Sequence, residues 1–294
     1  MEQMSYTSPY ENQSGRWVRG SFHGHCSENS RCASVPLAES VRMYKEAGAG
    51  FVTLTDHDVI TDLSGIQAEH PEMVFVPGFE YSTRENVVFA GPGVTPLYTE
   101  TLEDAVREAK DLLTIVAHPL RYQDRDYWTR PMLEALGTMP DGTEVYNGHY
   151  GIESALASGR WPLYTSFWDE LLTAGHRLWG YANDDFHDPV DFGNAYNMVL
   201  VDDLTPESVI ASAKAGQCYA TTGLLPTRIE AVGGQLNVEV GDVCDGRFVG
   251  QGGDILQETS GTTFGYSATD EPYVRFEAEG EKGRLFLQPT FRNP

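Results

Sequence analysis

Groups of histidine and carboxylate residues recur along this sequence, and each lies at the end of an apolar segment. The groups are His23-Gly24-His25, Asp56-His57-Asp58, Glu80 in Pro-Gly-Phe-Glu-Tyr, His118 before Pro119, and Asp185-Phe186-His187. Imidazole and carboxylate side chains are ligands of divalent metals, and several must converge before an ion is held. Together the groups predict a divalent metal centre.

Each group taken singly also has an ordinary structural interpretation. Two histidines separated by one residue lie on the same face of a strand by geometry alone. Asp56 suits a turn or a helix start, and Glu80 suits a surface position. The recurrence of five groups in one position relative to the apolar segments favours the metal centre. A structural role is the interpretation for the histidines and cysteines outside these groups, namely His70, His149, His176, Cys26 and Cys32.

The elements that must position these side chains alternate between strands and helices. The pattern predicts strands at 17–22, 51–55, 73–76, 86–90, 112–117, 143–146, 178–182 and 197–201, and helices at 36–48, 102–110, 165–174 and 206–215. Such alternation implies parallel strands joined by right-handed crossovers. Pattern alone does not separate an open sheet from a closed barrel. Ligands at the ends of many strands favour the barrel, because barrel active sites form at one rim.

The pattern changes after Gly223. Short alternating segments follow, such as 236–240, 247–249 and 273–278, and turns rich in Gly and Asp separate them. Alternation of this kind is typical of antiparallel strands. We therefore expect an α/β domain over 1–223 and a small antiparallel β domain over 224–294, with the chemistry confined to the first.

Composition disfavours several classes of partner. The chain has 294 residues, a formal charge of −23 and four lysines. Such a surface repels nucleic acid and anionic membranes, whose binding normally depends on Lys and Arg. No apolar stretch reaches the roughly 18 residues of a membrane span, and the first residues lack the pattern of a signal peptide. The cysteine spacing indicates no disulfide framework. We expect a cytoplasmic protein that acts on a small molecule.

The ordered set of motifs resembles the polymerase and histidinol phosphatase (PHP) family over residues 17–223. The resemblance includes Thr55-Asp56-His57-Asp58, Ala117-His118-Pro119 and the segment 216–223, which is similar to one that closes the domain in stand-alone members. It implies a distorted (βα)7 barrel that binds up to three divalent ions, commonly Zn, Mn or Fe. It also implies hydrolysis of phosphate esters through a metal-activated water.

The resemblance assigns ligands residue by residue. A first ion is expected on His23, His25, Glu80 and Asp185, with Glu80 bridging to a second ion on His118, and a third is expected on His57 and His187. Two positions depart from the family pattern, because Ser30-Arg31 and Asn86-Val87 stand where it often has further ligands. Glu28, Asp56 and Asn86 are candidates to replace them. We therefore expect one to three ions per chain.

Catalytic roles follow from the same set. Asp185 or His187 is expected to handle the proton, and Arg31 to bind substrate phosphate. Arg84 and Arg121 have the same chemistry, but a surface ion pair is the preferred interpretation for both. The leading hypothesis is a metal-dependent phosphoesterase that acts on a small phosphorylated metabolite. The alternatives are a metal-dependent hydrolase of C–N or lactone bonds and a non-catalytic metal-binding module.

Overall fold

Strands that end in the predicted ligands form the centre of the molecule. A computed structural model describes residues 5–294. The strands of this part are β2 (Arg16–Ser21), β3 (Phe51–Leu54), β4 (Val74–Tyr81), β5 (Val87–Ala90), β6 (Leu113–Val116), β7 (Gly142–Asn147), β8 (Trp179–Asn183), β9 (Tyr196–Val201) and β10 (Cys218–Thr221). β2, β3 and β4 pair in parallel, as do β6, β7 and β8. Their carboxyl ends therefore share one rim.

Parallel pairing is interrupted at two strands. β5 lies between β4 and β6 and is antiparallel to both. The loop 82–86 that precedes β5 is too short for a crossover, so the chain can only turn back as a hairpin. β9 is antiparallel to both β2 and β10. The expectation that the predicted strands of this part pair in parallel was therefore wrong at β5 and β9, and β10 was not among the predicted strands.

The strand β4 is longer than predicted and runs through Pro77-Gly78. The missing N–H of Pro77 does not break the strand, because the Pro77 carbonyl accepts a hydrogen bond from Gly91 N (2.9 Å). Glycine is required at position 78, since a Cβ there would lie 2.6 Å from the Phe89 carbonyl oxygen. The close approach of these two backbones carries β4 on to Glu80.

Side-chain amides link strands β8 and β9, which no backbone ladder joins. The Asn197 amide accepts from Ala182 N (3.0 Å) and donates to Ala182 O (2.7 Å). The Gln288 amide makes the same pair of bonds with Gly180, both at 2.7 Å. At the rim, Gly24 and Phe186 form an isolated parallel bridge. The ring of strands is thus bridged at this point, and a continuous ladder that would close a barrel is not present among residues 5–294.

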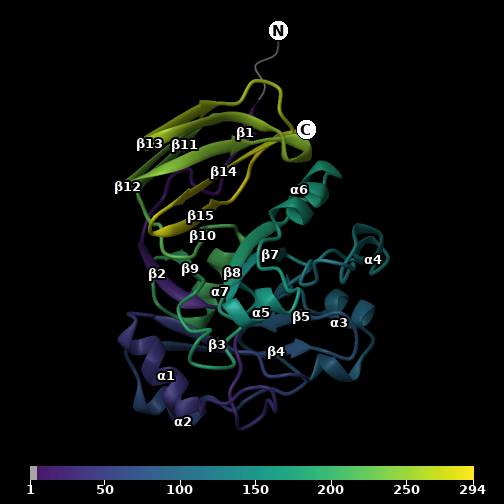
Figure 1. The fold of residues 1–294 in the computed structure, drawn as a ribbon. Helices are drawn as coiled ribbons and strands as arrows, with labels where there is room; N and C mark the ends of the chain where they lie inside the picture. The colour runs from purple at the N-terminus through teal and green to yellow at the C-terminus, as the bar shows by residue number, and fades with distance from the viewer. Residues whose placement is uncertain (1–4) are drawn as a thin grey trace.

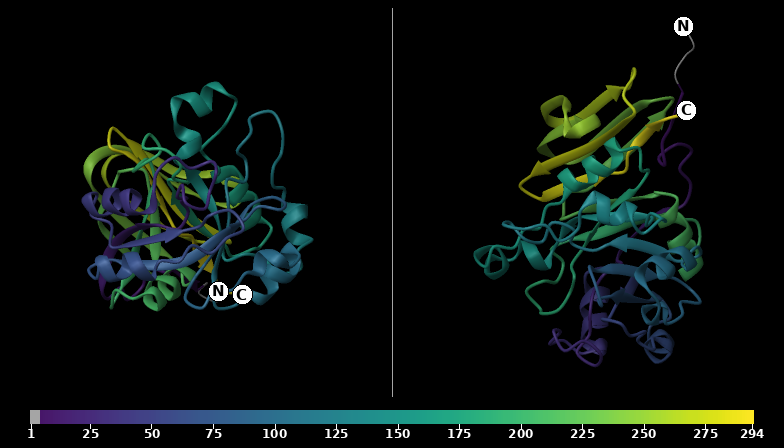
Figure 2. Two further views of the ribbon diagram at one scale, coloured as in Figure 1. Left: turned by 90° about the horizontal axis from the view of Figure 1, so that it is seen from below. Right: turned by 90° about the vertical axis from the view of Figure 1, so that its right-hand side faces the viewer.

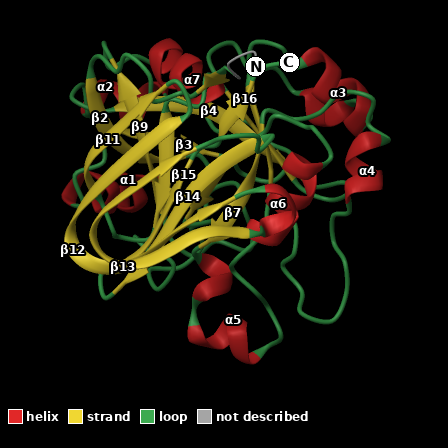
Figure 3. Cartoon of the chain, turned by 90° about the horizontal axis from the view of Figure 1, so that it is seen from above, coloured by secondary structure: helices red, strands yellow, loops and turns green. Residues whose placement is uncertain are grey.

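The helices lie around the outside of the strands (Figure 3). Four correspond to predicted helices: α1 (Leu37–Glu46), α3 (Leu102–Glu108), α6 (Thr165–Thr173) and α7 (Pro206–Lys214). The predicted cap of α3 is present, as Thr101 Oγ1 accepts from Asp104 N at 3.2 Å. The short helices α2 (Ser64–Glu69), α4 (Arg130–Glu134) and α5 (Glu153–Ala157), and the 3-10 turns η1 (Leu97–Thr99), η2 (His149–Gly151) and η3 (Gln251–Gly253), were not predicted. Segments this short show no helical period.

The C-terminal region is antiparallel, as expected. Its strands are β11 (Pro226–Val232), β12 (Gln235–Val249), β13 (Ile255–Ser267), β14 (Tyr273–Gly280), β15 (Gly283–Leu287) and β16 (Thr290–Arg292). The segments 236–240 and 247–249 belong to the single strand β12. This region caps one end of the α/β part (Figures 1 and 2) and joins it where β15 pairs with β10. The N-terminal strand β1 (Tyr6–Thr7) pairs with β16.

An ion network is buried where α6 meets the C-terminal strands. Arg275 donates to Asp169 through Nε (2.7 Å) and Nη2 (2.6 Å), and its Nη1 contacts Glu277. Tyr273 also donates to Asp169, at 3.1 Å. All four side chains are buried. The network fixes the β region against α6. Across residues 5–294, the structure contains no helix long and apolar enough to cross a membrane.

Candidate metal centre

The ends of five strands bring the predicted ligands into one buried cluster. His23 and His25 follow β2, His57 follows β3, Glu80 lies near the end of β4, His118 follows β6, and Asp185 and His187 follow β8. Of these, His23, His25 and Glu80 have no exposed surface, and His118 and Asp185 are 2% exposed. The cluster thus combines two carboxylates with five imidazoles at the strand rim.

Two carboxylates organise the cluster. Asp185 Oδ1 lies 3.1 Å from both His23 Nε2 and His25 Nε2. The two oxygens of Glu80 lie 3.4 Å and 3.5 Å from the same two nitrogens. Glu80 Oε1 also lies 3.2 Å from His118 Nε2, and its Oε2 lies 2.9 Å from His57 Nδ1. Glu80 therefore stands between the His23–His25 pair and two further imidazoles.

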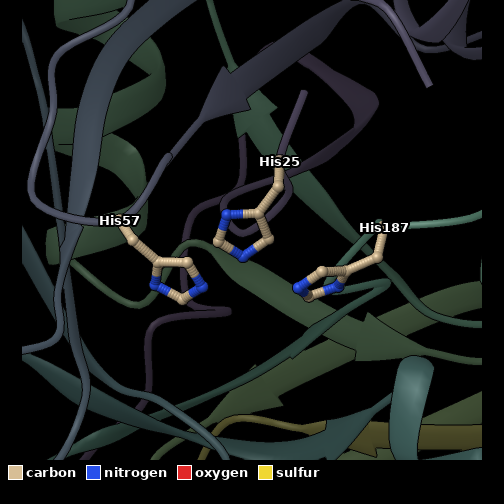
Figure 4. Close-up of side chains that lie close together, drawn as sticks. All are labelled: His25, His57 and His187. Atoms are coloured by element: carbon tan, nitrogen blue, oxygen red, sulfur yellow. The ribbon is translucent and has the colours of Figure 1, made fainter. Parts of the chain in front are cut away.

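A third group consists of imidazoles from three different segments. Ring nitrogens of His25, His57 and His187 lie within 4.8 Å of one another. Figure 4 shows these rings gathered around a common space. The His25 ring is 4.6 Å from that of His57 and 4.4 Å from that of His187. His187 Nδ1 donates to the Asp185 carbonyl at 2.6 Å, which leaves Nε2 available.

The donor set fits divalent ions. Among residues 5–294, His23 Nε2 and Glu80 Oε2 are buried and lack a hydrogen bond of acceptable geometry. Buried polar atoms without partners cost free energy, so they indicate that a partner belongs there. Imidazole nitrogens with carboxylate oxygens are the combination that zinc, manganese and iron accept. The cluster therefore offers the donors that such ions need.

Backbone strain is concentrated at the same rim. Asp58, His118 and Asp185 have φ values of +50°, +33° and +51°, in the left-handed region that L-residues rarely occupy. Each such residue costs about 1–3 kcal/mol and persists only where its surroundings hold it. The His118 N–H is held by Glu144 Oε2 (2.8 Å), and the Asp58 carboxylate by Ser82 N (2.9 Å). The strain aims side chains that a relaxed strand end would direct elsewhere.

Glu144, from β7, supports the ligands without facing the cluster directly. Its Oε1 accepts from His23 Nδ1 at 2.9 Å, and its Oε2 accepts from Asn147 Nδ2 at 2.9 Å. The bond to His23 fixes the ring tautomer that leaves Nε2 free for an ion.

Replacing Glu144 with Gln should weaken metal binding by about 10- to 100-fold while leaving the fold intact. The amide N–H₂ that replaces one carboxylate oxygen would face the N–H donor of His23 or of Asn147, and the hydrogen bond to that residue would be lost. Affinity for Zn²⁺ measured by competition with a chelator checks this, with Glu153→Gln, an exposed change in α5, as the matched control. Equal affinities in the two variants would contradict the supporting role.

Asp56 differs from its predicted role as a ligand. Its carboxylate accepts hydrogen bonds from Cys26 N (2.9 Å), Ser30 Oγ (2.6 Å) and Thr61 Oγ1. Ser30 Oγ in turn lies 3.3 Å from His25 Nδ1. With both oxygens occupied, Asp56 holds the loop after β2 and orients His25 through Ser30.

The other proposed substitutes for missing ligands are also engaged elsewhere. Glu28 accepts from Leu37 N at the start of α1 (2.9 Å), and Asn86 Oδ1 accepts from the Tyr127 hydroxyl. Arg31 is exposed, and within residues 5–294 no hydrogen bond or ion pair holds its guanidinium in the site. Arg84 forms the surface ion pair that was preferred for it, with Glu103 at 2.6 Å.

His149, which was given a structural interpretation from sequence, lies beside the candidate metal centre. The His149 ring, in η2, is 4.7 Å from that of His187, and its Nδ1 donates to Asp191 Oδ1 at 3.0 Å. His149, His187 and Asp191 also offer ligand atoms within 4.8 Å of one another. The signal that sequence reasoning missed is the position of His149 just after β7, at the same rim as the other ligands.

Protonated histidines balance the negative charges of the two carboxylates, Glu80 and Asp185. Burial acts to lower the pKa of His57, but Cys32 and Glu80 raise it to about 10. For His187, burial again acts downward, while Asp185 and Cys32 raise the pKa to about 9. Burial would raise the pKa of Glu80 and of Asp185, yet the neighbouring histidines hold both well below their usual range.

Metal binding should therefore release protons near neutral pH. His57 and His187 carry protons below their raised pKa values of about 10 and 9, and an ion must displace them. Affinity should rise with pH until those values are passed and then level off. Calorimetric titration of Zn²⁺ at pH 7.5 in two buffers of different ionisation enthalpy measures the release. Burial acts to lower the pKa of His23, but Asp185, Glu80 and Glu144 hold it well above its usual range, so this imidazole also loses a proton to an ion. We expect about three protons per chain; identical heats in both buffers would contradict it.

Comparison with solved structures identifies the fold. The chain is similar over 100% of its length, and 99% of the other, to a two-domain protein from Bacteroides vulgatus that contains a predicted PHP-like metal-dependent phosphoesterase, with a TM-score of 0.55 and 16% identity. At this identity the likeness concerns the fold alone. It covers both the α/β part and the C-terminal β region, and it agrees with the fold implied by the motifs.

Two further structures are less similar. An amidohydrolase from Chromobacterium violaceum with bound sulfate and no metal gives a TM-score of 0.41 at 14% identity, over 58% of this chain and 88% of that one. The lesion-specific endonuclease EndoQ from Pyrococcus furiosus gives 0.44 at 15%, over 69% and 56%. No family model and no curated protein matches the sequence.

Proposed function

We propose that the protein is a metal-dependent hydrolase that cleaves a phosphate ester of a small metabolite. The observation that carries the proposal is the position of Glu80, whose two oxygens each lie within 3.5 Å of two imidazoles on different sides. A carboxylate placed in this way is suited to bridge two ions. The small-molecule class is supported by the charge of −23, which disfavours a polyanionic polymer.

The residues are assigned to ions as follows. The first ion would be held by His23, His25, Glu80 and Asp185. A second would be held by Glu80 and His118. A third would be held by His57 and His187, with His25 beside them. Zinc, manganese or iron suits these donors. When bound, the ions would supply Lewis-acid activation of water and of a phosphoryl oxygen. All the assigned residues lie in the proposed hydrolase domain, residues 1–223, and none in the appendage, residues 224–294.

Side chains of the site would handle orientation and the proton. Asp185 is committed to two imidazoles through Oδ1, and its Oδ2 accepts from Asn147 Nδ2 at 3.1 Å. His187 is less committed, because its Nδ1 bonds only the Asp185 carbonyl and its ring is partly exposed. We therefore assign proton transfer to the leaving oxygen to His187 when no third ion is bound, since its Nε2 can then carry the proton that the step needs.

Metal analysis with a substrate panel tests the proposal. The purified chain, supplied with Mn²⁺ or Zn²⁺, is assayed against phosphate monoesters, amides and lactones, and its metal content is measured. We expect two or more ions per chain and turnover of the phosphate esters only. Cleavage confined to amides or lactones would replace the proposal with a C–N or lactone hydrolase. One chelator-resistant ion without turnover would replace it with a metal-binding module.

A further inference from the structure

We infer that Arg121 and Arg160 form an oxyanion-binding pair that holds a phosphate group of the substrate beside the metal ligands. The inference rests on the proposed function, since it names the substrate group that this same site recognises. Neither arginine belongs to the ligand set. The preferred interpretation of Arg121 from sequence was a surface ion pair, and the structure contradicts it.

Two segments far from each other in the chain pair to bring these arginines together. The loop after β6 runs beside the segment that follows α5, with a bridge between Tyr122 and Arg160. Trp161 N donates to the Arg121 carbonyl at 3.2 Å, and Gln123 N donates to the Gly159 carbonyl at 3.0 Å. Both guanidinium groups are thus carried on a paired backbone and not on free loops.

Neither guanidinium has an anionic partner. Within the described residues, Arg121 and Arg160 form no ion pair, and Arg121 Nε and Arg160 Nη1 are buried without a hydrogen-bond partner. Other arginines such as Arg42 and Arg130 pair with carboxylates, as expected in a chain with 43 acidic and 20 basic residues. Both residues are half-buried, and buried N–H groups without partners are costly, so these two positions favour an anion from outside the chain.

Aromatic rings hold the guanidinium planes. Arg121 lies over the Tyr127 ring at 3.7 Å, and its Nη1 donates to the Tyr150 hydroxyl at 3.4 Å. Arg160 lies over the Tyr122 ring at 4.3 Å and 5.3 Å from that of Tyr150. Stacking of this kind occupies the face of a guanidinium and leaves its N–H edge for a ligand.

The same rings connect the pair to the metal centre. The rings of Tyr127 and Tyr150 lie 5.7 Å and 5.3 Å from that of His118, which contacts Glu80. An anion held by the two arginines would therefore lie on the His118 side of the centre. Tyr122, whose ring Arg160 covers, also lines an open cleft of about 680 Å³ together with Asp124, Arg125 and Asp126, and this cleft gives room for the part of a substrate beyond its phosphate.

Charge and geometry select the class of anion. Guanidinium N–H edges match the oxygens of phosphate or carboxylate in a two-point contact. Two unpaired cations match the two negative charges that a phosphate monoester carries near neutral pH. Carboxylate shares the contact geometry but carries one charge, so the pair is expected to prefer phosphate.

Phosphate binding by the full-length protein tests the inference. Inorganic phosphate and acetate are titrated calorimetrically into the chain, both metal-loaded and treated with chelator. Arg121→Met and Arg160→Met should each weaken phosphate binding by about tenfold or more in both forms, the loss expected for charged hydrogen bonds. Arg84→Met, which removes the surface arginine paired with Glu103, should bind phosphate as the unaltered protein does.

The outcomes separate this inference from the proposed function. Unchanged phosphate affinity in both Met variants would overturn the pair even if the protein hydrolyses phosphate esters. Loss of affinity in the chelated form would support it even if hydrolysis were absent. Acetate bound as tightly as phosphate would overturn the phosphate class. Arg121→Lys and Arg160→Lys guard against misfolding: with unchanged melting temperature and metal content, they should raise KM for a phosphate monoester more than they lower kcat.

Discussion

Replacing Glu80 with Gln is expected to remove metal and hydrolytic activity together. Glu80 contacts four imidazoles, those of His23, His25, His57 and His118, at distances from 2.9 to 3.5 Å. Glutamine keeps the size of the side chain but loses its charge and turns one oxygen into a donor. Because supporting residues alone typically change metal affinity by about 10- to 100-fold, loss of this central ligand should lower affinity and kcat/KM by at least about 100-fold.

The matched control is Glu72→Gln, an exposed change that affects surface pairs with Lys45 and His70. It should leave metal content and activity unchanged. Elemental analysis after dialysis and turnover of a phosphate monoester are the two measurements. The assignment of the centre would be wrong if Glu80→Gln kept both at the level of the control. Loss of activity with full metal content would instead limit Glu80 to a catalytic role.

Replacing Asp169 with Asn should destabilise the protein by about 3–5 kcal/mol, the usual cost of removing one partner from a buried ion pair. Both oxygens of Asp169 accept hydrogen bonds from Arg275, and one also accepts from Tyr273. An asparagine would direct an amide N–H₂ at the guanidinium. Arg275 would then keep Glu277 as its only carboxylate partner among the described residues, and Glu277 is shared with Arg247.

Urea unfolding followed by tryptophan fluorescence and by circular dichroism measures this loss. Glu170→Gln is the control, since Glu170 is the next residue of α6 and its contact with Arg130 is exposed. An exposed pair contributes about 1 kcal/mol or less. Equal effects of the two changes would show that the buried network does not hold the β region to α6. The double change Asp169→Leu with Arg275→Met should recover part of the stability, because it leaves neither charge alone.

The positions of the candidate ligands could be predicted because they depend on local pattern. A β-branched, apolar segment such as 51–55 favours a strand, and the residues that directly follow the strand then lie at the rim. His57 and His118 follow this rule, as do the histidines after β2. Helices such as α7 were predictable for the same reason, since one apolar face repeats over several turns.

Strand direction depended on more than pattern. β5 has the same apolar character as its neighbours β4 and β6, and only the short loop 82–86 forces it to run antiparallel to both. The amide of Asn197 links β8 to β9, and the amide of Gln288 links β8 to the segment after β15. The periodicity of the sequence does not indicate which side chains form hydrogen bonds in place of a backbone ladder, so these links could not be predicted.

The sequence by itself determined which residues reach the rim, because strand periodicity and the position of each ligand after its strand are local properties. The tertiary structure alone decided what each side chain contacts there. It turned Asp56 towards Cys26 and Ser30, paired His149 with Asp191 across 42 positions, and placed Arg121 and Arg160 together without an acidic partner. These contacts join distant segments, and their free energies depend on burial and on neighbouring charges that only the folded chain creates.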